Sequence, residues 1–286
     1  MKFSKYEKDL KTMKICLAIQ SLRSCNLEEA AAIGHALGFN AMDLDGVMDT
    51  TLKREGIIKV DQSEVKRVKD FGLIFPNIHW TFSTGNLFPA INDPDPAIRA
   101  DNREQIKGLV EFCNLAEIHS ILALPGMLLP GQSVIESQKL SAEVLNEFVE
   151  IAQKADITFM VEPHVKSSFE SPGSALWLAE QVKGMGIVLD YSHFICQGYT
   201  QSEVDILIPY TKHVHLRQAK NGLLQTKLED GTINFSLVLD NLRIAGFDGY
   251  LSVEYVHQDF IGATNVDVLT ETVKMRDFLK DNVWDE

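Results

Sequence analysis

Three carboxylates and one histidine stand where apolar runs of the sequence end. Glu162 follows ITFMV, Asp190 follows GIVL and Glu254 follows LSV, while His215 lies in HVHL. Burying a carboxylate without a partner is costly, and carboxylates that pack together repel one another. A divalent cation bound by all four side chains would offset both costs. The pattern therefore predicts a metal site.

The predicted ligand set is rich in oxygen and has a single imidazole. Such a set suits Mn²⁺, Mg²⁺ or Co²⁺ better than a structural Zn²⁺, although Zn²⁺ stays a candidate. Any one of the acids, taken alone, could instead cap a helix or pair with a lysine. Four such residues at the ends of four successive runs are hard to explain as independent accidents.

Further polar residues lie near the same run ends and are candidate substrate contacts. They are His79, His193, Arg217 and His257. For Arg217 a salt bridge to a surface acid is the open alternative, and for His79 it is a capping or core position. His213 lies two residues before His215, on the same face of the strand, and is expected to be a buried, hydrogen-bonded histidine.

The elements that must position these residues alternate between strand and helix. Eight short apolar runs predict strands: Ile15–Ile19, Ala41–Leu44, Leu73–Phe75 continuing to Ile78–Trp80, Ser120–Leu124, Ile157–Glu162, Gly186–Asp190, His213–Leu216 and Leu251–Tyr255. The runs recur about every 34 residues, and amphipathic helical patterns fill most intervals. This favours a single α/β domain, a (β/α)8 TIM barrel, whose active site lies at the carboxyl ends of the strands. A doubly wound open sheet is the alternative.

Helix signals and loops complete the organisation. Asn26 precedes a predicted helix that Gly38 ends, and Ser171 with Pro172 opens another. We expect residues 1–13 to form a polar extension and residues 14–286 to form the barrel. The segment Thr81–Ala97 is predicted to be a long loop, of the kind that serves as a lid or as part of a binding site.

Composition narrows the classes of partner. The 286 residues include 40 acidic and 27 basic ones, for a net charge of −13, which argues against a nucleic-acid or anionic-membrane partner bound through a broad basic face. No apolar run approaches the length of a membrane span, and no apolar segment follows the charged N-terminus, so we expect a cytoplasmic protein. The four cysteines form no CxxC pair.

Three segments together resemble a known family. They are EPH at Glu162–His164, LDYSHFICQGY at Leu189–Tyr199, and HLRQAKNG at His215–Gly222 followed by GTINF and GFDGYLSVEY. Their order and spacing resemble the xylose isomerase-like TIM barrels, a group that includes sugar epimerases and isomerases, dehydratases and AP endonucleases. The resemblance covers about Lys14–Leu279.

The resemblance to the ketose 3-epimerases of that family implies roles for particular residues. It implies one divalent metal, manganese among the candidates, held by Glu162, Asp190, His215 and Glu254. Glu162 and Glu254 would be the catalytic pair, exchanging a proton next to a metal-bound carbonyl from opposite faces of a small sugar or sugar acid. His193 matches the family's Asp-x-x-His motif, in which the histidine contacts substrate. A homodimer or homotetramer is open by analogy.

Departures from the family pattern are informative as well. AP endonucleases hold three zinc ions with extra histidines, but Leu124 stands here before Pro125–Gly126 and no histidine lies near Asp230. This disfavours an AP endonuclease. Gln218 replaces the aspartate that often follows the metal histidine by three residues, which affects the expected substrate contacts.

Two other functions share these features. A metal-dependent sugar-acid or dehydroshikimate-type dehydratase, a lyase, would use the same ligands, and a non-catalytic sugar-binding barrel would use the same fold. The ligand set does not choose between epimerisation, isomerisation and dehydration.

Overall fold

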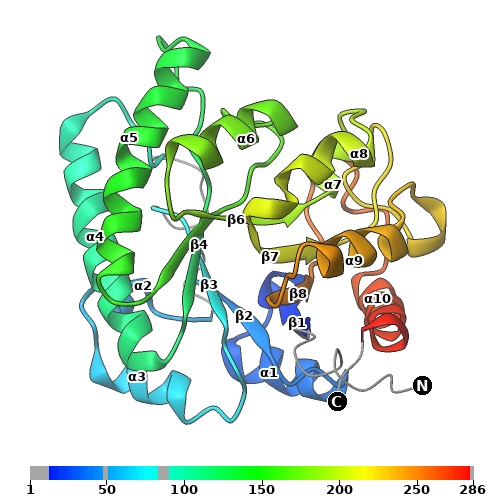
Figure 1. Ribbon diagram of the computed structural model, residues 1–286. Helices are drawn as coiled ribbons and strands as arrows, with labels where there is room; N and C mark the ends of the chain where they lie inside the picture. The colour runs from blue at the N-terminus through cyan, green and yellow to red at the C-terminus, as the bar shows by residue number, and fades with distance from the viewer. Residues whose placement is uncertain (1–12, 48–50, 83–89, 284–286) are drawn as a thin grey trace, which may run out of the picture.

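Eight parallel strands close into a barrel in the computed structural model, which describes residues 13–47, 51–82 and 90–283 (Figure 1). The strands are β1 Lys14–Ala18, β2 Met42–Asp45, β3 Asn77–Trp80, β4 Ser120–Ala123, β5 Thr158–Val161, β6 Gly186–Asp190, β7 Thr211–Leu216 and β8 Tyr250–Val253. They follow one another around the barrel in chain order, and β1 pairs with β8 to close it. The predicted (β/α)8 barrel is confirmed, and the open-sheet alternative is wrong.

Helices connect the strands and form the outer layer. The α-helices are α1 Leu27–Ala36, α2 Arg54–Ile58, α3 Gln62–Lys69, α4 Pro96–Ala116, α5 Val134–Gln153, α6 Pro172–Gln181, α7 Ser192–Ile195, α8 Gln201–Val204, α9 Phe235–Ile244 and α10 Val268–Asn282. The described residues also form three 3-10 helices, η1 Ile19–Leu22, η2 Asp205–Tyr210 and η3 Leu228–Asp230. No helix within the described ranges is long and apolar enough to cross a membrane.

One predicted strand is shorter than expected. The run Leu73–Phe75 was expected to continue into the third strand, but β3 begins only at Asn77. Ile74 makes an isolated bridge to Ala41. Pro76 lies between the two pieces and has no N–H to donate to a ladder, which explains the interruption.

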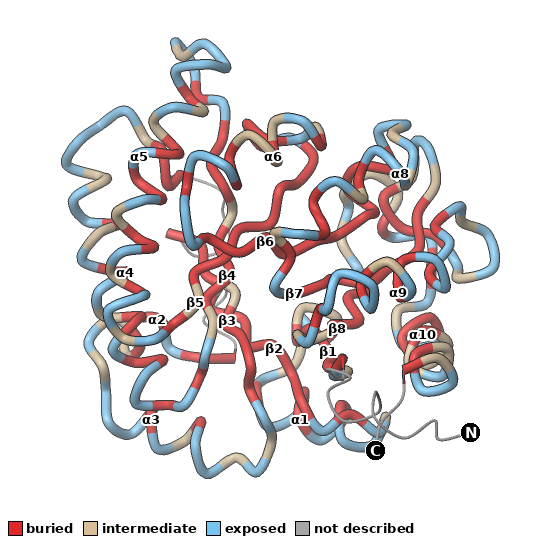
Figure 2. The backbone as a smooth tube through the Cα atoms, viewed as in Figure 1, coloured by how far each residue is buried: buried red, intermediate tan, exposed pale blue. Residues whose placement is uncertain are grey.

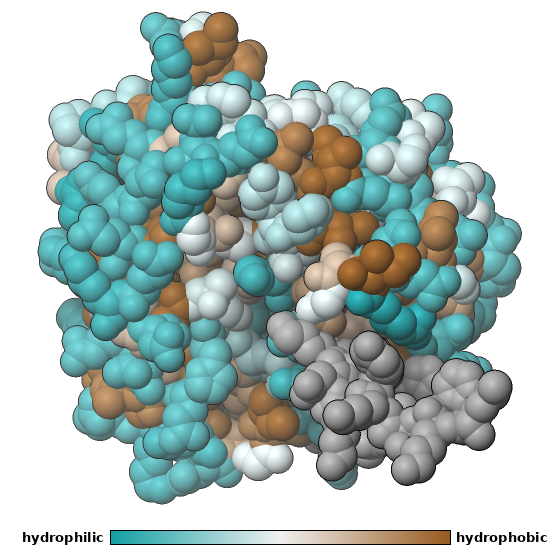
Figure 3. Space-filling model, viewed as in Figure 1, coloured by the Kyte–Doolittle hydropathy of each residue, from teal (hydrophilic) through white to brown (hydrophobic). Residues whose placement is uncertain are grey.

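The strands are buried on both sides, whereas the helices expose their outer faces (Figure 2). Phe148 of α5 illustrates the packing, because its ring lies 5.6 Å from that of Phe82 and 6.0 Å from that of Phe159 in β5. The face of the molecule in Figure 3 is mainly hydrophilic, with several smaller apolar areas. Val134 and Ile135, at the start of α5, are among the exposed apolar side chains. The barrel is thus a packed scaffold rather than a pore.

The predicted helix signals act as expected. The side chain of Asn26 accepts a hydrogen bond from the backbone N–H of Glu29 in a capping box, and Gly38 has a φ of +85° just beyond α1. Ser171 caps α6, and Pro172 occupies its first turn. Both features satisfy backbone groups that a helix end leaves free.

Two predictions fall partly outside the described residues. The predicted extension, residues 1–13, lies outside them except for Met13, which is buried in the core. Of the predicted loop Thr81–Ala97, residues 83–89 lie outside them. The loop ends earlier than expected, because Asp95 caps α4 and Pro96 opens it.

Candidate metal centre

The four predicted ligands meet at the carboxyl ends of neighbouring strands. Asp190 ends β6 and His215 lies in β7, while Glu162 and Glu254 directly follow β5 and β8. The backbone N–H groups of Glu162 and Glu254 still bond to the adjacent strands, at Ala123 O and Leu216 O. This extension of the ladder fixes both side chains. All four are buried, and one potential ligand atom from each lies within 4.8 Å of the others.

His215 and Arg217 form ion pairs with the three carboxylates. His215 Nδ1 lies 2.6 Å from Glu162 Oε1 and 3.2 Å from Glu254 Oε2. Arg217 Nη2 donates to Asp190 Oδ2 at 2.6 Å and lies 3.4 Å from Glu254 Oε2. The other oxygen of Asp190, Oδ1, accepts the backbone N–H of Ser192 at 2.8 Å, which starts α7. Each carboxylate is therefore held by a named neighbour.

The surroundings shift the pKa values of Glu162 and Glu254 in opposite directions. Burial alone raises the pKa of Glu254, but His215 and Arg217 outweigh it and lower that pKa to about 2. Burial raises the pKa of Glu162, which the charge of His215 only partly offsets. Burial lowers the pKa of His215, yet the carboxylates of Glu254 and Glu162 bring it well above its ordinary value. The site attracts positive charge strongly.

The donor set fits a divalent cation. It offers three carboxylates and one imidazole, and this is the set of ligands that hard or borderline divalent metals take. Glu254 Oε2 is buried and forms ion pairs with His215 Nδ1 and Arg217 Nη2, at 3.2 and 3.4 Å. In the part of the chain that the structure describes, the three buried carboxylates face Arg217 and, when protonated, His215 and His193. A bound cation would balance them.

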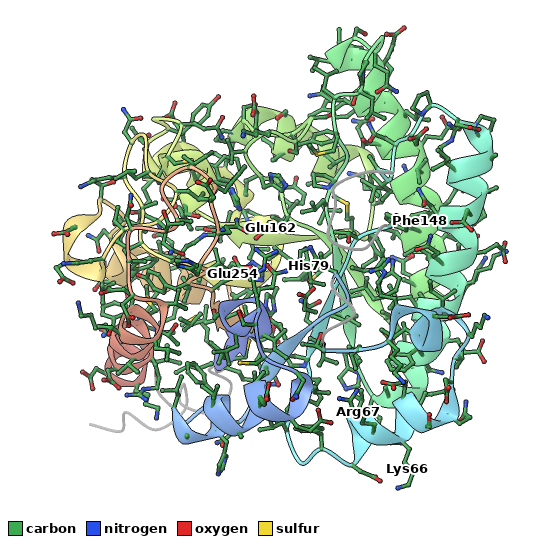
Figure 4. All side chains as sticks on the ribbon, turned by 180° about the vertical axis from the view of Figure 1, so that it is seen from behind. Lys66, Arg67, His79, Phe148, Glu162 and Glu254 are labelled. Carbon is green, nitrogen blue, oxygen red and sulfur yellow. The ribbon has the colours of Figure 1, made fainter. Side chains whose placement is uncertain are left out.

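A cavity of about 330 Å³ opens beside these residues. Its wall includes the catalytic candidates Glu162 and Glu254 together with His79, His193 and Arg217. Figure 4 shows His79, Glu162 and Glu254 gathered in the middle of the barrel, away from Lys66 and Arg67 on the outer helix. His257 is exposed and is not among the residues that line the cavity.

Arg217 holds His193 and Asp190 together. Its Nε donates to Ser192 Oγ at 2.9 Å, and its Nη2 lies 2.9 Å from His193 Nε2. Because a guanidinium can only donate, His193 Nε2 is the acceptor and the ring proton lies on Nδ1. Burial and the charge of Arg217 lower the pKa of His193 well below its usual value. The alternative of a surface salt bridge for Arg217 is wrong, since its partner Asp190 is buried.

Two further histidines, His79 and His213, differ in position. His79 is hydrogen-bonded through Nδ1 to the side chain of Gln20, and burial lowers its pKa to about 4, so it is neutral at pH 7. Its Nε2 lacks a partner among the described residues. His213 Nε2 lies 2.8 Å from Asp43 Oδ2 below the site, which confirms the expected buried, hydrogen-bonded histidine.

Sequence reasoning missed Asp45 and His164 as parts of the cavity wall. Asp45 ends the strand MDLD, so it carries the same signal as the predicted ligands, an acid at a strand end. Burial raises its pKa to about 6. His164 follows β5 in EPH, and its ring stacks on that of His193 at 5.2 Å.

Two departures from the family pattern have a structural explanation. Leu124, in place of a histidine, lies in the cavity wall. Gln218 is buried in the loop after β7, where its Oε1 accepts the backbone N–H groups of Ala219 and Ile233 at 3.0 and 2.9 Å. Its side chain thus holds the loop rather than lining the cavity.

A sequence profile decides the family. The profile of the family described as xylose isomerase-like TIM barrel matches residues 30–281. The chain belongs to the xylose isomerase-like TIM barrel family. The match spans the barrel from α1 to α10, and so includes all four residues of the candidate centre.

Individual relatives share only about a fifth of their sequence with this chain. The L-ribulose-5-phosphate 3-epimerase UlaE of Shigella flexneri serotype 5b is 23% identical over 263 residues, 88% of each chain. A solved L-ribulose 3-epimerase superposes with a TM-score of 0.71 at 18% identity, covering 94% of both chains. The IOLI protein, whose crystal structure has a bound zinc atom, superposes with a TM-score of 0.74 at 17% identity, over 96% of this chain and all of that one.

Proposed function

We propose that the protein is a divalent-metal-dependent epimerase or isomerase of a small sugar or sugar acid. One observation supports this most strongly: Glu162 and Glu254 border the same cavity, and both contact His215 Nδ1, at 2.6 and 3.2 Å. They follow β5 and β8, three steps apart around the barrel. A substrate between them would meet a carboxyl group on each face.

The metal would be held by Glu162, Asp190, His215 and Glu254. When bound there, a divalent cation supplies Lewis acidity that polarises a substrate carbonyl and acidifies the neighbouring C–H. The solved relative with zinc is consistent with such a centre. The donor set favours Mn²⁺, Mg²⁺ or Co²⁺ and also accepts Zn²⁺.

The two glutamates would divide proton removal and return. Glu254, with its lowered pKa, is ionised and suited to accept the proton next to the carbonyl. Glu162, which borders the same cavity, would return a proton to the other face. In the reverse reaction the two roles exchange.

The neutral residues would orient the sugar. His79 Nε2 and His193 Nδ1 are buried ring nitrogens without partners among the described residues. Both rings belong to the cavity wall, so each is available to a substrate hydroxyl. Arg217 would act by fixing the tautomer of His193. His257, exposed and away from the wall, is the least supported of the proposed substrate contacts.

A proton-exchange screen tests the proposal. The protein, loaded with Mn²⁺, is incubated in D₂O with ketoses, ketose phosphates, aldoses and sugar acids. We expect deuterium at the carbon next to the carbonyl and an epimer or isomer as product. A product lighter by about 18 Da, the mass of water, would assign the lyase reaction instead. Sugar binding that survives chelation without any exchange would indicate a non-catalytic barrel.

Variants of the two glutamates complete the test. Glu162→Gln and Glu254→Gln should each lower turnover about 10²–10⁴-fold, the usual effect of losing a general acid or base. Glu143→Gln, an exposed glutamate on α5, is the matched control and should keep wild-type turnover. Full activity in either cavity variant contradicts the proposed mechanism.

A further inference from the structure

A second layer of polar side chains lies under the candidate metal centre. It consists of Cys16 in β1, Asp43 in β2, His213 in β7 and Ser252 in β8, all buried. These four strands are consecutive around the closure of the barrel. Ser252 pairs in register with Cys16 on one side and with His215 on the other. The layer therefore adjoins the imidazole of the centre.

Asp43 lies between the two histidines of β7. Its Oδ2 is 2.8 Å from His213 Nε2 and 4.0 Å from His215 Nε2, and it accepts the thiol of Cys16 at 3.7 Å. Its other oxygen, Oδ1, has no hydrogen-bond partner among the described residues. Asp43 is 3% exposed, so solvent does not satisfy that oxygen. Asp43 is thus a buried carboxylate with one unpartnered oxygen, and its other oxygen lies 4.0 Å from His215 Nε2.

The two nitrogens of His215 face different groups. Nδ1 lies against Glu162 and Glu254, the carboxylates of the candidate centre, while Nε2 faces Asp43. An imidazole binds a metal only through an unprotonated nitrogen. Use of Nδ1 therefore leaves the ring proton on Nε2. Metal-bound histidines usually donate this proton to a carboxylate or carbonyl, which fixes the ring and raises its basicity.

We infer that Asp43 is the positioning residue of the metal centre: the carboxylate, 4.0 Å away, toward which His215 directs its Nε2 proton when Nδ1 binds a metal, and which is itself held by His213. This inference rests on the proposed function, because it assigns Asp43 a task only if His215 binds a metal.

The same residues allow one competing interpretation. Cys16, Asp43 and His213 have ligand atoms within 4.8 Å of one another and could themselves hold an ion. The existing hydrogen bond of 2.8 Å between His213 and Asp43, and the contact of Asp43 with Cys16, favour a supporting layer instead. A second ion is therefore an outcome that the test must distinguish.

Metal affinity measures the contribution of Asp43 directly. Mn²⁺ titrations compare the wild type, Asp43→Asn and Cys16→Ser, the last being a matched change in the same buried layer that leaves His215 and Asp43 in place. We expect Asp43→Asn to bind Mn²⁺ about 10–100-fold more weakly, the usual effect of losing such a partner, with Cys16→Ser staying within about threefold of wild type. One ion per chain is expected throughout.

Several results would overturn the inference. They are an unchanged affinity in Asp43→Asn, an equal loss in Cys16→Ser, or two ions per wild-type chain. If Asp43→Asn does not fold, ¹H–¹⁵N NMR of the wild type loaded with Mg²⁺ decides: the Nε2 proton of His215 must show the downfield shift of a proton directed at a carboxylate, and an Nε2 proton without that shift overturns the inference. A wild type that binds no divalent metal overturns the proposed function as well. Metal binding that Asp43→Asn leaves intact overturns only the inference.

Discussion

At the scale of single residues, neighbours decide what each carboxylate does. Glu162 and Glu254 are both buried and contact the same imidazole, yet their pKa values move apart. Arg217 lies 3.4 Å from Glu254 and helps to lower its pKa, whereas burial and the charges of Glu254 and Asp190 raise that of Glu162. Burial raises the pKa of Asp45 to about 6, and the charges of Arg23 and Arg54 only partly offset it. The same carboxyl chemistry thus yields one group with a lowered pKa and two with raised pKa values.

The raised pKa of Asp45 predicts a pH-dependent stability difference. A carboxyl group whose pKa rises on folding favours the folded state below pH 4, and this contribution is lost as the pH rises through about 6. Without metal, raising the pH from 4.5 to 7.5 should therefore lower the free energy of unfolding of the wild type by about 2 kcal/mol more than that of Asp45→Asn. Urea unfolding in EDTA measures this, with the exposed Asp281→Asn as control. A difference that does not change with pH contradicts the prediction.

At the scale of elements, α2 and α4 can pack closely because Gly108 of α4 has no side chain. A Cβ at Gly108 of α4 would lie 2.0 Å from the carbonyl oxygen of Ile58, where α2 ends. A Cβ at Gly173 of α6 would meet no atom within 4 Å. Both glycines lie in helices, so intrinsic helix propensity alone would favour alanine at each.

Alanine substitution at the two glycines should have opposite effects. Gly108→Ala should lower the free energy of unfolding by about 1–3 kcal/mol, because the backbone of Ile58 must move to admit the methyl group. Gly173→Ala should raise it by up to about 1 kcal/mol, through propensity and a less flexible unfolded chain. Urea unfolding of both variants measures the pair. Equal effects would mean that α2 and α4 do not pack as closely as described.

At the scale of the whole molecule, the acidic residues behind the net charge of −13 are not all in the same surroundings. Most acids lie on solvated helix faces, but Glu162, Asp190 and Glu254 are buried together at the top of the barrel. Their mutual repulsion weakens the folded state unless cations oppose it. Stability of the entire chain should therefore depend on the proposed metal.

Removal of metal should lower the melting temperature. A ligand at about 100 times its Kd stabilises the folded state by about 2.7 kcal/mol, which corresponds to roughly 5–10 °C for a chain of this size. Thermal unfolding with Mn²⁺ and after thorough chelation measures the difference. The shift should shrink in Glu254→Gln, which lacks one ligand charge. An unchanged melting temperature in the wild type would count against the centre.

The sequence by itself determined the strands and the four candidate ligands. Both are local patterns: an apolar run predicts a buried strand, and a polar residue at its end, as in GIVLD, predicts a side chain at the rim of a barrel. The number and order of such runs then fix which ends are neighbours. For this reason Glu162, Asp190, His215 and Glu254 could be grouped although 92 positions separate the first from the last.

Only the tertiary structure decided which side chains contact one another across the barrel. The bond of His213 to Asp43 joins residues 170 positions apart, and it exists because β1 and β8 close the sheet in one register. Arg217 contacts Asp190 and His193, and His257 lies outside the cavity. A periodic pattern assigns a residue to a face of its own strand, whereas its partner depends on register and loop path, which no local pattern encodes.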